Sequence, residues 1–212
     1  MIGQERRGAL TLLTLDRAGK ANALTEAMLR DLTTRLEGLA GDGTRAVVLT
    51  GAGKVFSAGA DLDEAQRGLA RSDAWRALSS RMATMPCLTI AALNGTLAGG
   101  AFGMVLACDL RLAVPEAQFF YPVMKLGYQP PQGDPERLVR LVGPARAKMI
   151  LLAGARIGAE EALAWGLVDR LAPAAELIAA ACALAEPPLA AAEGHVAALK
   201  ARVEAPQSPA LL

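Results

Sequence analysis

Apolar runs of strand length alternate with helical stripes in the first half of the chain. Residues 9–15 and 45–50 are two such runs, and leucines at helical spacing lie between them. Further strands are predicted at 88–93 and 110–114, with a buried helix at 98–107 between them. Strands that alternate with helices in this way predict an α/β domain.

The first predicted helix has a recognisable start and end. Thr25 is a good N-cap residue, Glu26 adds a carboxylate to the first turn, and an apolar stripe follows at helical spacing. Gly41 and Gly43 lie where the stripe stops. A second helical stretch, with a weaker pattern, is predicted at about 62–83.

Beyond about residue 135 the pattern is almost entirely helical. We therefore divide the chain into a core, residues 1–143, and a helical C-terminal region, residues 144–212. Residues 184–188, Leu-Ala-Glu-Pro-Pro, are the closest approach to a hinge. The helices predicted in this part are 136–141, 145–152, 159–165, 174–185 and 189–203.

Two turns of small residues interrupt the apolar pattern. Residues 56–61 (Phe-Ser-Ala-Gly-Ala-Asp) and 97–103 (Leu-Ala-Gly-Gly-Ala-Phe-Gly) each follow a strand-like run and open a helix-like one. Such turns leave backbone N–H groups unpaired and let a ligand approach the main chain closely. If both converge on one point, they form an oxyanion hole, which stabilises negative charge on a carbonyl oxygen. Close packing of backbone is the alternative interpretation.

Composition and charge exclude several classes of protein. A chain of 212 residues fits one domain, and 53% hydrophobic residues exclude disorder. A net charge of +1, from 22 basic and 21 acidic residues, gives no electrostatic footprint for nucleic acid. The uncharged segment 86–108 is long enough to span a bilayer, but the turn at Asn94-Gly95 splits it. We interpret it as a buried strand followed by a buried helix, with no membrane partner.

The cysteines and the N-terminus favour a cytoplasmic protein. Cys87, Cys108 and Cys182 are widely spaced in apolar surroundings, which is typical of core thiols and not of disulfides or metal ligands. Arg6 and Arg7 are not followed by the apolar segment that a secretion signal needs. No metal-ligand spacing and no phosphate-binding motif occurs in the sequence.

A series of short segments extends over about residues 9–203 in a fixed order. They are 15–17, 22–24, 47–51, 56–62, 91–95, 98–100, 107–109, 117–119, 126–127 and 161–169. In this order the segments resemble the crotonase superfamily, also called the enoyl-CoA hydratase/isomerase family. The resemblance implies an α/β fold, a spiral of repeated ββα units with a helical C-terminal part.

The resemblance also implies a function and its residues. An acyl-CoA thioester would bind in an elongated groove, and no cofactor other than this substrate is expected. The N–H groups of Ala60 and Gly100 would form the oxyanion hole, polarise the thioester carbonyl and hold an enolate. The residues implied along the nucleotide and pantetheine path are Lys20, Ala21, Ala58, Ala60, Asp61, Leu62 and Gly100.

The chain departs from the family pattern at the catalytic carboxylates. Hydratases that resemble it carry a glutamate three residues beyond the second oxyanion glycine, where this chain has Gly103. A second glutamate follows a proline, and here Val123 follows Pro122; isomerase-type members keep only this one. Some isomerases place an aspartate after the next proline, where this chain has Pro131. A standard hydratase mechanism is not expected, because each missing acid–base group lowers the rate roughly 10²–10⁴-fold.

Other carboxylates could replace the missing glutamates. Asp134 and Glu136 follow the loop 128–133, and a shift of that loop would bring Asp134 into the pocket. Asp-Pro-Glu is also a helix-start signal, so helix capping by Asp134 is the alternative. Asp63 and Glu64 follow the first turn, where carboxylates are favoured by the helix dipole alone.

The remaining polar candidates are aromatic. Tyr121 and Tyr128 could donate a hydrogen bond to the acyl group, with packing as the alternative. His195 is the only histidine and lies far in sequence from both turns. A surface position is expected for it, and a Ser-His-Asp triad is not.

Three hypotheses for the function follow. The first is an enzyme that acts on an acyl-CoA thioester through oxyanion stabilisation, with an unusual acid–base group or none. The second is an ordinary enoyl-CoA hydratase or isomerase in which Asp134, Glu136 or Glu64 replaces the glutamates. The third is an inactive subunit that binds acyl-CoA or acts as a scaffold. The resemblance implies a homotrimer or a hexamer, although family members usually continue in further helices that pack on a neighbouring subunit.

Overall fold

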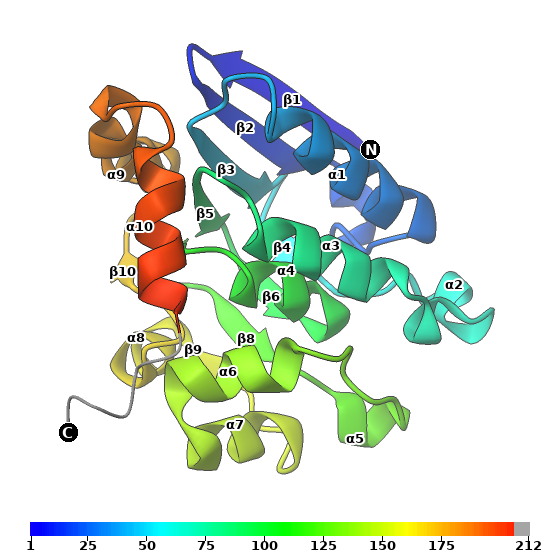
Figure 1. The fold of residues 1–212 in the computed structure, drawn as a ribbon. Coiled ribbons are helices and arrows are strands. Elements are labelled where there is room, and N and C mark those ends of the chain that lie inside the picture. Colours follow the sequence, from blue (N-terminus) through cyan, green and yellow to red (C-terminus); the bar gives the residue numbers. More distant parts are fainter. Residues whose placement is uncertain (206–212) are drawn as a thin grey trace.

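The computed structural model describes residues 1–205, which form two β-sheets covered by helices (Figure 1). The larger sheet has the strand order β1 (Ile2–Arg7), β2 (Leu10–Leu15), β3 (Ala46–Gly51), β5 (Leu88–Leu93), β7 (Leu110–Ala113) and β10 (Arg170–Leu171). The smaller sheet has the order β4 (Val55–Ser57), β6 (Thr96–Ala98), β8 (Gln118–Phe120) and β9 (Ile157–Gly158).

Helices connect most of these strands. Three short 3₁₀ segments are η1 (Ala18–Lys20), η2 (Leu69–Arg71) and η3 (Gly99–Ala101). The α-helices are α1 (Glu26–Leu39), α2 (Leu62–Gln66), α3 (Ala74–Ala83), α4 (Phe102–Leu106), α5 (Val123–Leu126), α6 (Asp134–Val142), α7 (Pro144–Leu151), α8 (Ala159–Trp165), α9 (Leu177–Ala190) and α10 (His195–Glu204).

The elements repeat as ββα units. β3 and β4 precede α2 and α3, β5 and β6 precede α4, and β7 and β8 precede α5 and α6. In each unit the first strand joins the larger sheet and the second joins the smaller one, with parallel pairing between successive units. The chain therefore winds as a spiral, which confirms the expected α/β architecture.

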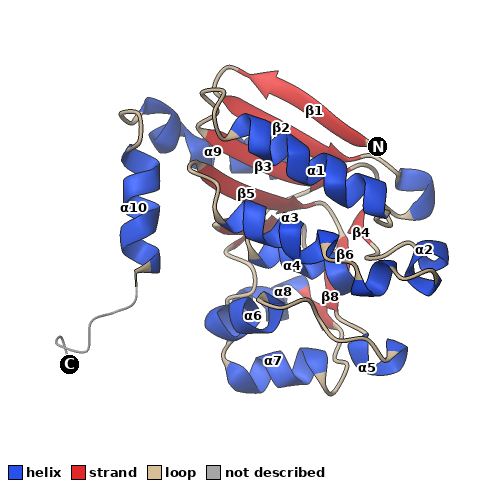
Figure 2. Cartoon of the chain, turned by 45° about the vertical axis from the view of Figure 1, so that its right-hand side comes forward, coloured by secondary structure: helices blue, strands red, loops and turns tan. Residues whose placement is uncertain are grey.

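The central strands of the larger sheet are buried on both faces, whereas the edge strand β1 is mostly exposed. All six residues of β3 are buried, as expected for a parallel strand covered on two sides. Figure 2 shows α1 and α3 in front of this sheet, and α9 packs against β2, β3, β5 and β7 from the other side. Leu29, Leu32 and Leu36 of α1 are fully buried, so the predicted apolar stripe is the core face of that helix. Thr25 accepts a hydrogen bond from the N–H of Met28, which confirms it as the N-cap.

Three predictions about elements were wrong. The helix expected at 62–83 is divided into α2, η2 and α3, because Gly68 adopts a positive φ of 115°. Pro187 and Pro188 lie inside α9, so the expected hinge is part of a helix. The helix expected from residue 189 begins only at His195. β1 and the three-residue strands β4, β6 and β8 were not predicted.

The helix α10 lies apart from the core, without a buried residue. It is attached by Lys200, whose Nζ donates to Asp109 Oδ2 at 2.8 Å and to the carbonyl oxygen of Cys87 at 3.1 Å. The same Asp109 oxygen accepts from the N–H and the hydroxyl of Thr89 on β5. Lys200 therefore connects this helix to the residues that directly precede β5 and β7.

The uncharged segment 86–108 forms β5, β6, η3 and α4, as its central turn predicted. Among residues 1–205 no single helix is both long and apolar enough to cross a membrane; α9 and α10 together pass by length and composition, with a bend of 107° between them. Cys87, Cys108 and Cys182 are free thiols. Burial raises the pKa of Cys87 to about 11 and that of Cys108 to about 12.

Candidate active site

The two small-residue turns lie against each other. Gly59 adopts a positive φ of 91°, and a Cβ atom at this position would lie 2.8 Å from the carbonyl oxygen of Ala98. Gly99, with a φ of 55°, lies on the other side of the same contact. Only glycine fits such a backbone conformation and such a close approach without strain. The predicted convergence of residues 56–61 and 97–103 is therefore present.

The hydrogen bonds around Ala60 leave its N–H unused. Leu24 donates its N–H to the carbonyl of Gly59 at 2.7 Å, and Asp61 donates to the carbonyl of Leu24 at 2.8 Å. These two hydrogen bonds form a β-bridge between Leu24 and Ala60 that does not involve the N–H of Ala60. Within residues 1–205, the N–H groups of Ala60 and Gly100 donate to no protein acceptor. Gly100 lies in the first turn of a helical segment, where unpaired N–H groups are expected.

Ala60 and Gly100 line one cavity of about 460 Å³. This volume is within the range of small-molecule sites, and most lining side chains are apolar. Ala58 and Leu62 from the implied substrate path line it as well, and Leu62 is 72% exposed. The other lining residues are Ala65, Gln66, Ala70, Trp75, Gly99, Phe120, Tyr121, Pro122, Val123, Lys125, Leu126, Tyr128, Gln129 and Pro131.

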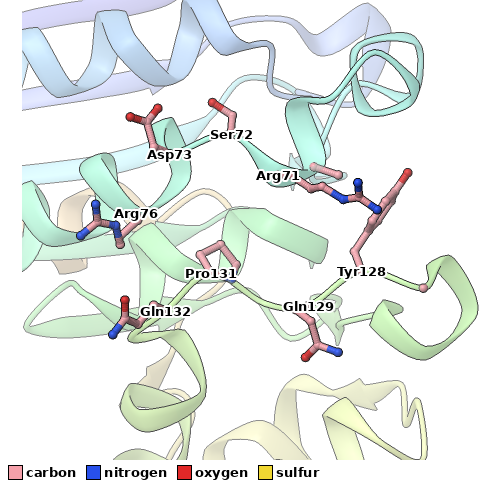
Figure 3. A pocket seen from close by; sticks show the side chains of 10 residues that line it. Arg71, Ser72, Asp73, Arg76, Tyr128, Gln129, Pro131 and Gln132 are labelled. Atoms are coloured by element: carbon pink, nitrogen blue, oxygen red, sulfur yellow. The ribbon is translucent and has the colours of Figure 1, made fainter.

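A second cavity, of about 550 Å³, adjoins the first. The two share Ala70, Tyr128, Gln129 and Pro131. Its other walls carry polar and charged groups, and Figure 3 shows the side chain of Arg71 directed towards Tyr128. An apolar chamber that contains the two turns thus opens next to a polar one. The remaining residues of the second cavity are Ser72, Asp73, Arg76, Gly127 and Gln132.

Three residues of the implied substrate path do not line the first cavity. Lys20 is exposed in η1, and Ala21 follows it with a φ of 49°. The carbonyl of Ala21 accepts from the N–H of Ala58 at 2.9 Å, so this segment is held beside the first turn. Asp61 accepts from Arg17 at 2.7 Å and from two N–H groups at the start of α2. The hydrogen bond from Arg17 lowers the pKa of Asp61.

The carboxylates that follow the first turn point elsewhere. Glu64 accepts from the N–H of Glu26 at 2.8 Å and so connects α2 to α1. Asp63 is exposed. Neither residue lines either cavity. Their positions in the first turn of α2 support the helix-dipole interpretation.

Asp134 does not cap a helix. The N-cap of α6 is Gly133, whose N–H donates to the carboxylate of Glu136 at 3.1 Å. Asp134 is 1% exposed, and neither of its carboxylate oxygens accepts a hydrogen bond. Its closest cation is Arg137, whose Nη1 lies 3.6 Å from Oδ1. The capping alternative is wrong, because Gly133 is the N-cap and no N–H donates to the Asp134 carboxylate. Burial raises the pKa of Asp134 to about 7.

The carboxyl group of Asp134 fills the space beside Gly103. A Cβ atom on Gly103 would lie 2.6 and 2.8 Å from the two carboxylate oxygens. The ring of Tyr121 stacks on Phe102 with 5.3 Å between centroids. Burial and the charge of Asp134 both raise the pKa of the Tyr121 hydroxyl far above its usual range. Sequence reasoning missed the closeness of Asp134 and Gly103, because no local pattern connects them.

Trp75 is a second feature that the sequence did not reveal. It is buried, lines the cavity, and its ring would lie 3.1 Å from a Cβ atom on Gly100. Its indole N–H donates to the carbonyl of Leu69 at 2.8 Å, which fixes the ring. Tyr121 and Tyr128 line the cavity as well, whereas His195 is exposed at the start of α10.

No cluster of His, Cys, Asp and Glu with three or more members suited to a metal ion occurs within residues 1–205. The cavity is lined mainly by apolar side chains, by two tyrosines and by Ala60 and Gly100 of the two turns. Such an arrangement can bind a carbonyl group and stabilise negative charge on its oxygen.

Comparisons with known proteins agree with this arrangement. The family model "Enoyl-CoA hydratase/isomerase" matches residues 5–212. A Thermus thermophilus protein, named provisionally as an enoyl-CoA hydratase, is 40% identical over 192 residues, which cover 86% of this chain and 76% of the relative. A Mycobacterium tuberculosis protein, named as a probable enoyl-CoA hydratase, is 38% identical over 209 residues, covering 96% of this chain and 81% of the relative.

Solved structures agree as well. The crystal structure of an enoyl-CoA hydratase from Bacillus anthracis has a TM-score of 0.88 at 32% identity, and covers 95% of this chain and 81% of its own. The similarity extends over both sheets and the helices, because almost the whole described chain is included. The chain therefore belongs to the enoyl-CoA hydratase/isomerase family.

Proposed function

We propose that the protein is an enzyme that binds an acyl-CoA thioester and stabilises its enolate with the N–H groups of Ala60 and Gly100. One observation supports the proposal: Ala60 and Gly100, on turns from separate ββα units, both line one cavity, and within residues 1–205 neither N–H donates to a protein acceptor. The names of the relatives supply the substrate class, a coenzyme A thioester.

The chemistry follows from where charge develops. Removal of a proton from the carbon next to a thioester carbonyl leaves an enolate, whose negative charge lies mainly on the oxygen. Donors that already point at this oxygen need no reorganisation, and each contributes roughly 3 kcal/mol to transition-state stabilisation. Apolar walls exclude water and strengthen these hydrogen bonds. The proposal assigns no cofactor beyond the thioester.

A non-catalytic acyl-CoA-binding subunit is the second candidate. Gly103 and Val123 favour it, since the resemblance expects carboxylates at both positions. Such a protein would bind the thioester in the same cavity and leave it unchanged. Ordinary hydration is tested in the same assays. If the protein adds water to crotonyl-CoA, the absorbance of the 2-enoyl thioester decreases.

A substitution that removes one donor tests the proposal. Ala60→Pro deletes an N–H that no protein group uses, and should lower turnover of 2-enoyl- and 3-enoyl-CoA thioesters roughly 10²–10³-fold. Ala60→Gly keeps the N–H and should retain more activity than the proline variant. Steady-state kinetics and calorimetric binding of the same thioesters are measured for each protein. Equal turnover in the folded proline variant would refute the oxyanion assignment.

The assembly is measured in the same preparation. A homotrimer or a hexamer stays a prediction of the family resemblance, and sedimentation velocity of the purified chain distinguishes it from a monomer. A cytoplasmic location likewise stays a prediction.

A further inference from the structure

The carboxyl group of Asp134 is buried without the contacts that a structural carboxylate has. It is 1% exposed, and both oxygens lack a hydrogen-bond donor. The guanidinium of Arg137, at 3.6 Å, is too distant for a hydrogen bond, and its Nη1 is itself unsatisfied. A carboxylate buried in this way lowers the stability of the fold. The presence of a carboxyl group at this buried position is therefore explained better by a function than by stability.

The position of the carboxyl group indicates that reason. Residues three apart on a helical segment share a face, so Gly103 lies one turn beyond Gly100 on the same side. The two oxygens of Asp134 lie where a side chain at Gly103 would begin, 2.6 and 2.8 Å from its Cβ position. Gly103 is the position at which the resemblance expects a catalytic glutamate. Asp134 thus brings a carboxyl group to this place from α6.

Two neighbours connect Asp134 with the cavity. Its N–H donates to the carbonyl of Pro131 at 3.2 Å, and Pro131 lines the cavity. Tyr121 also lines the cavity, and the charge of Asp134 acts on its hydroxyl. Asp134 is therefore adjacent to residues of the cavity wall, although it does not line the cavity itself.

We propose that Asp134 is the acid–base catalyst of the site and that the reaction is proton transfer at the acyl carbons. This inference rests on the proposed function. The carboxylate takes a proton from the carbon next to the thioester carbonyl, the C–H electron pair forms the enolate, and the carbonyl oxygen carries the charge. Return of the proton to the same carbon gives exchange. In a 3-enoyl thioester the double bond joins C3 and C4. The carboxylate takes the proton from C2 and returns it to C4, so that the double bond moves to C2 and C3.

The charges around Asp134 are compatible with this role. Burial raises its pKa to about 7, with a smaller contribution from Glu136, while Arg137 opposes the shift. Ser79 on α3 faces the carboxyl group and as a hydrogen-bond donor would lower its pKa, but the Ser79 hydroxyl donates to the carbonyl of Trp75 at 3.0 Å instead. Tyr121 is neutral near pH 7, since even the ordinary pKa of a tyrosine is near 10 and burial raises it further. Both forms of the carboxyl group are therefore populated near neutrality, as general acid–base catalysis requires.

Deuterium exchange tests the proposal directly. A 3-enoyl-CoA thioester is incubated with the protein in D₂O, and mass spectrometry follows label in the recovered thioester and its 2-enoyl isomer. Asp134→Asn should reduce the exchange rate roughly 10²-fold or more while calorimetric binding of the thioester holds. The wild-type rate should rise with pH and level off above about pH 7, and the variant should lose this profile. Arg140→Gln, an exposed change on the same helix, is the matched control and should exchange as the wild type does.

A second variant leaves Asp134 in the chain. Gly103→Ala places a methyl group against the carboxylate oxygens, so the group must move, and exchange should fall roughly 10-fold or more with binding retained. If Asp134→Asn does not fold, the exchange rate of Gly103→Ala tests the role of Asp134 instead. Wild-type exchange in a folded Asp134→Asn or Gly103→Ala protein would overturn the proposal, as would binding of the thioester by the wild type without any exchange. Absence of thioester binding by the wild type would instead overturn the proposed function.

Discussion

Two glycines determine the site because of the space that they leave. At Gly59 the absent side chain lets the first turn contact Ala98, and at Gly103 it makes room for the carboxyl group of Asp134. The two positions differ in backbone, since only Gly59 adopts a positive φ. A methyl group should therefore cause strain and crowding at Gly59 but crowding alone at Gly103.

Gly59→Ala should separate the two turns. The new Cβ would lie 2.8 Å from the Ala98 carbonyl oxygen at a φ of 91°, so we expect a loss of about 1–3 kcal/mol in the free energy of unfolding and weaker thioester binding. Gly68→Ala is the control, because its φ is 115° and no atom lies within 4 Å of the added carbon. Urea unfolding and calorimetry measure both effects. Equal losses in the two variants would show that backbone strain, and not the contact with Ala98, determines the result.

At the scale of single residues the sequence predicted the turns better than the proposed acid–base group. Ala60 and Gly100 were assigned from the resemblance, and they line one cavity. Asp134 was a candidate, but Asp-Pro-Glu favoured a helix cap, a role that Gly133 has instead. The burial of Asp134 depends on α4 and α6 meeting in space, which no local pattern encodes.

Among the elements, the buried strands were the most predictable. β2, β3, β5 and β7 lie where the apolar runs predicted them, because a strand covered on both faces is apolar along its length. The three-residue strands β4, β6 and β8 are too short to show an alternating pattern. α9 continues through two prolines while it packs on four strands, so tertiary contacts outweigh its local propensity.

The attachment of α10 gives a prediction for an element. Lys200→Met removes the ammonium group that binds Asp109 and the Cys87 carbonyl, so amide hydrogen exchange in α10 should become about tenfold faster. Global stability should change little, because α10 has no buried residue. Arg202→Met, an exposed change on the same helix, is the control. Uniformly faster exchange in both sheets would contradict a local role for Lys200.

For the whole molecule, the spiral is what brings the site together. Ala60, Gly100 and Asp134 belong to three successive ββα units, and parallel pairing of β4, β6 and β8 aligns these units side by side. The fold could be predicted from the order of segments along the chain. The second cavity, with Arg71 and Arg76, could not, because it depends on how the loop near Tyr128 lies against η2.

The buried carboxyl group should also make the stability of the molecule depend on pH. The pKa of Asp134 is raised from 3.8 to about 7, so the folded state binds the proton more tightly than the unfolded state does. Its contribution to stability is therefore complete below about pH 4 and is lost as the pH rises through 7. Asp134→Asn stays neutral and should be more stable than the wild type at pH 8, by up to about 4 kcal/mol.

Urea unfolding at pH 4, 6 and 8 measures this dependence. The difference between wild type and Asp134→Asn should vanish at the lowest pH, where the carboxyl group is protonated in both states. A variant that is less stable than the wild type at pH 8 would show that the pair with Arg137 is a net stabilising ion pair.

The contact between Asp134 and Gly103 constrains how this sequence can evolve. A glutamate introduced at Gly103 would meet a carboxylate 2.6 Å from its Cβ atom, so that single change is disfavoured by both volume and charge. The opposite order, in which Asp134 is replaced first, leaves an intermediate with neither group. A change to two-glutamate chemistry would therefore need coupled substitutions, and libraries that vary one position at a time would not find it.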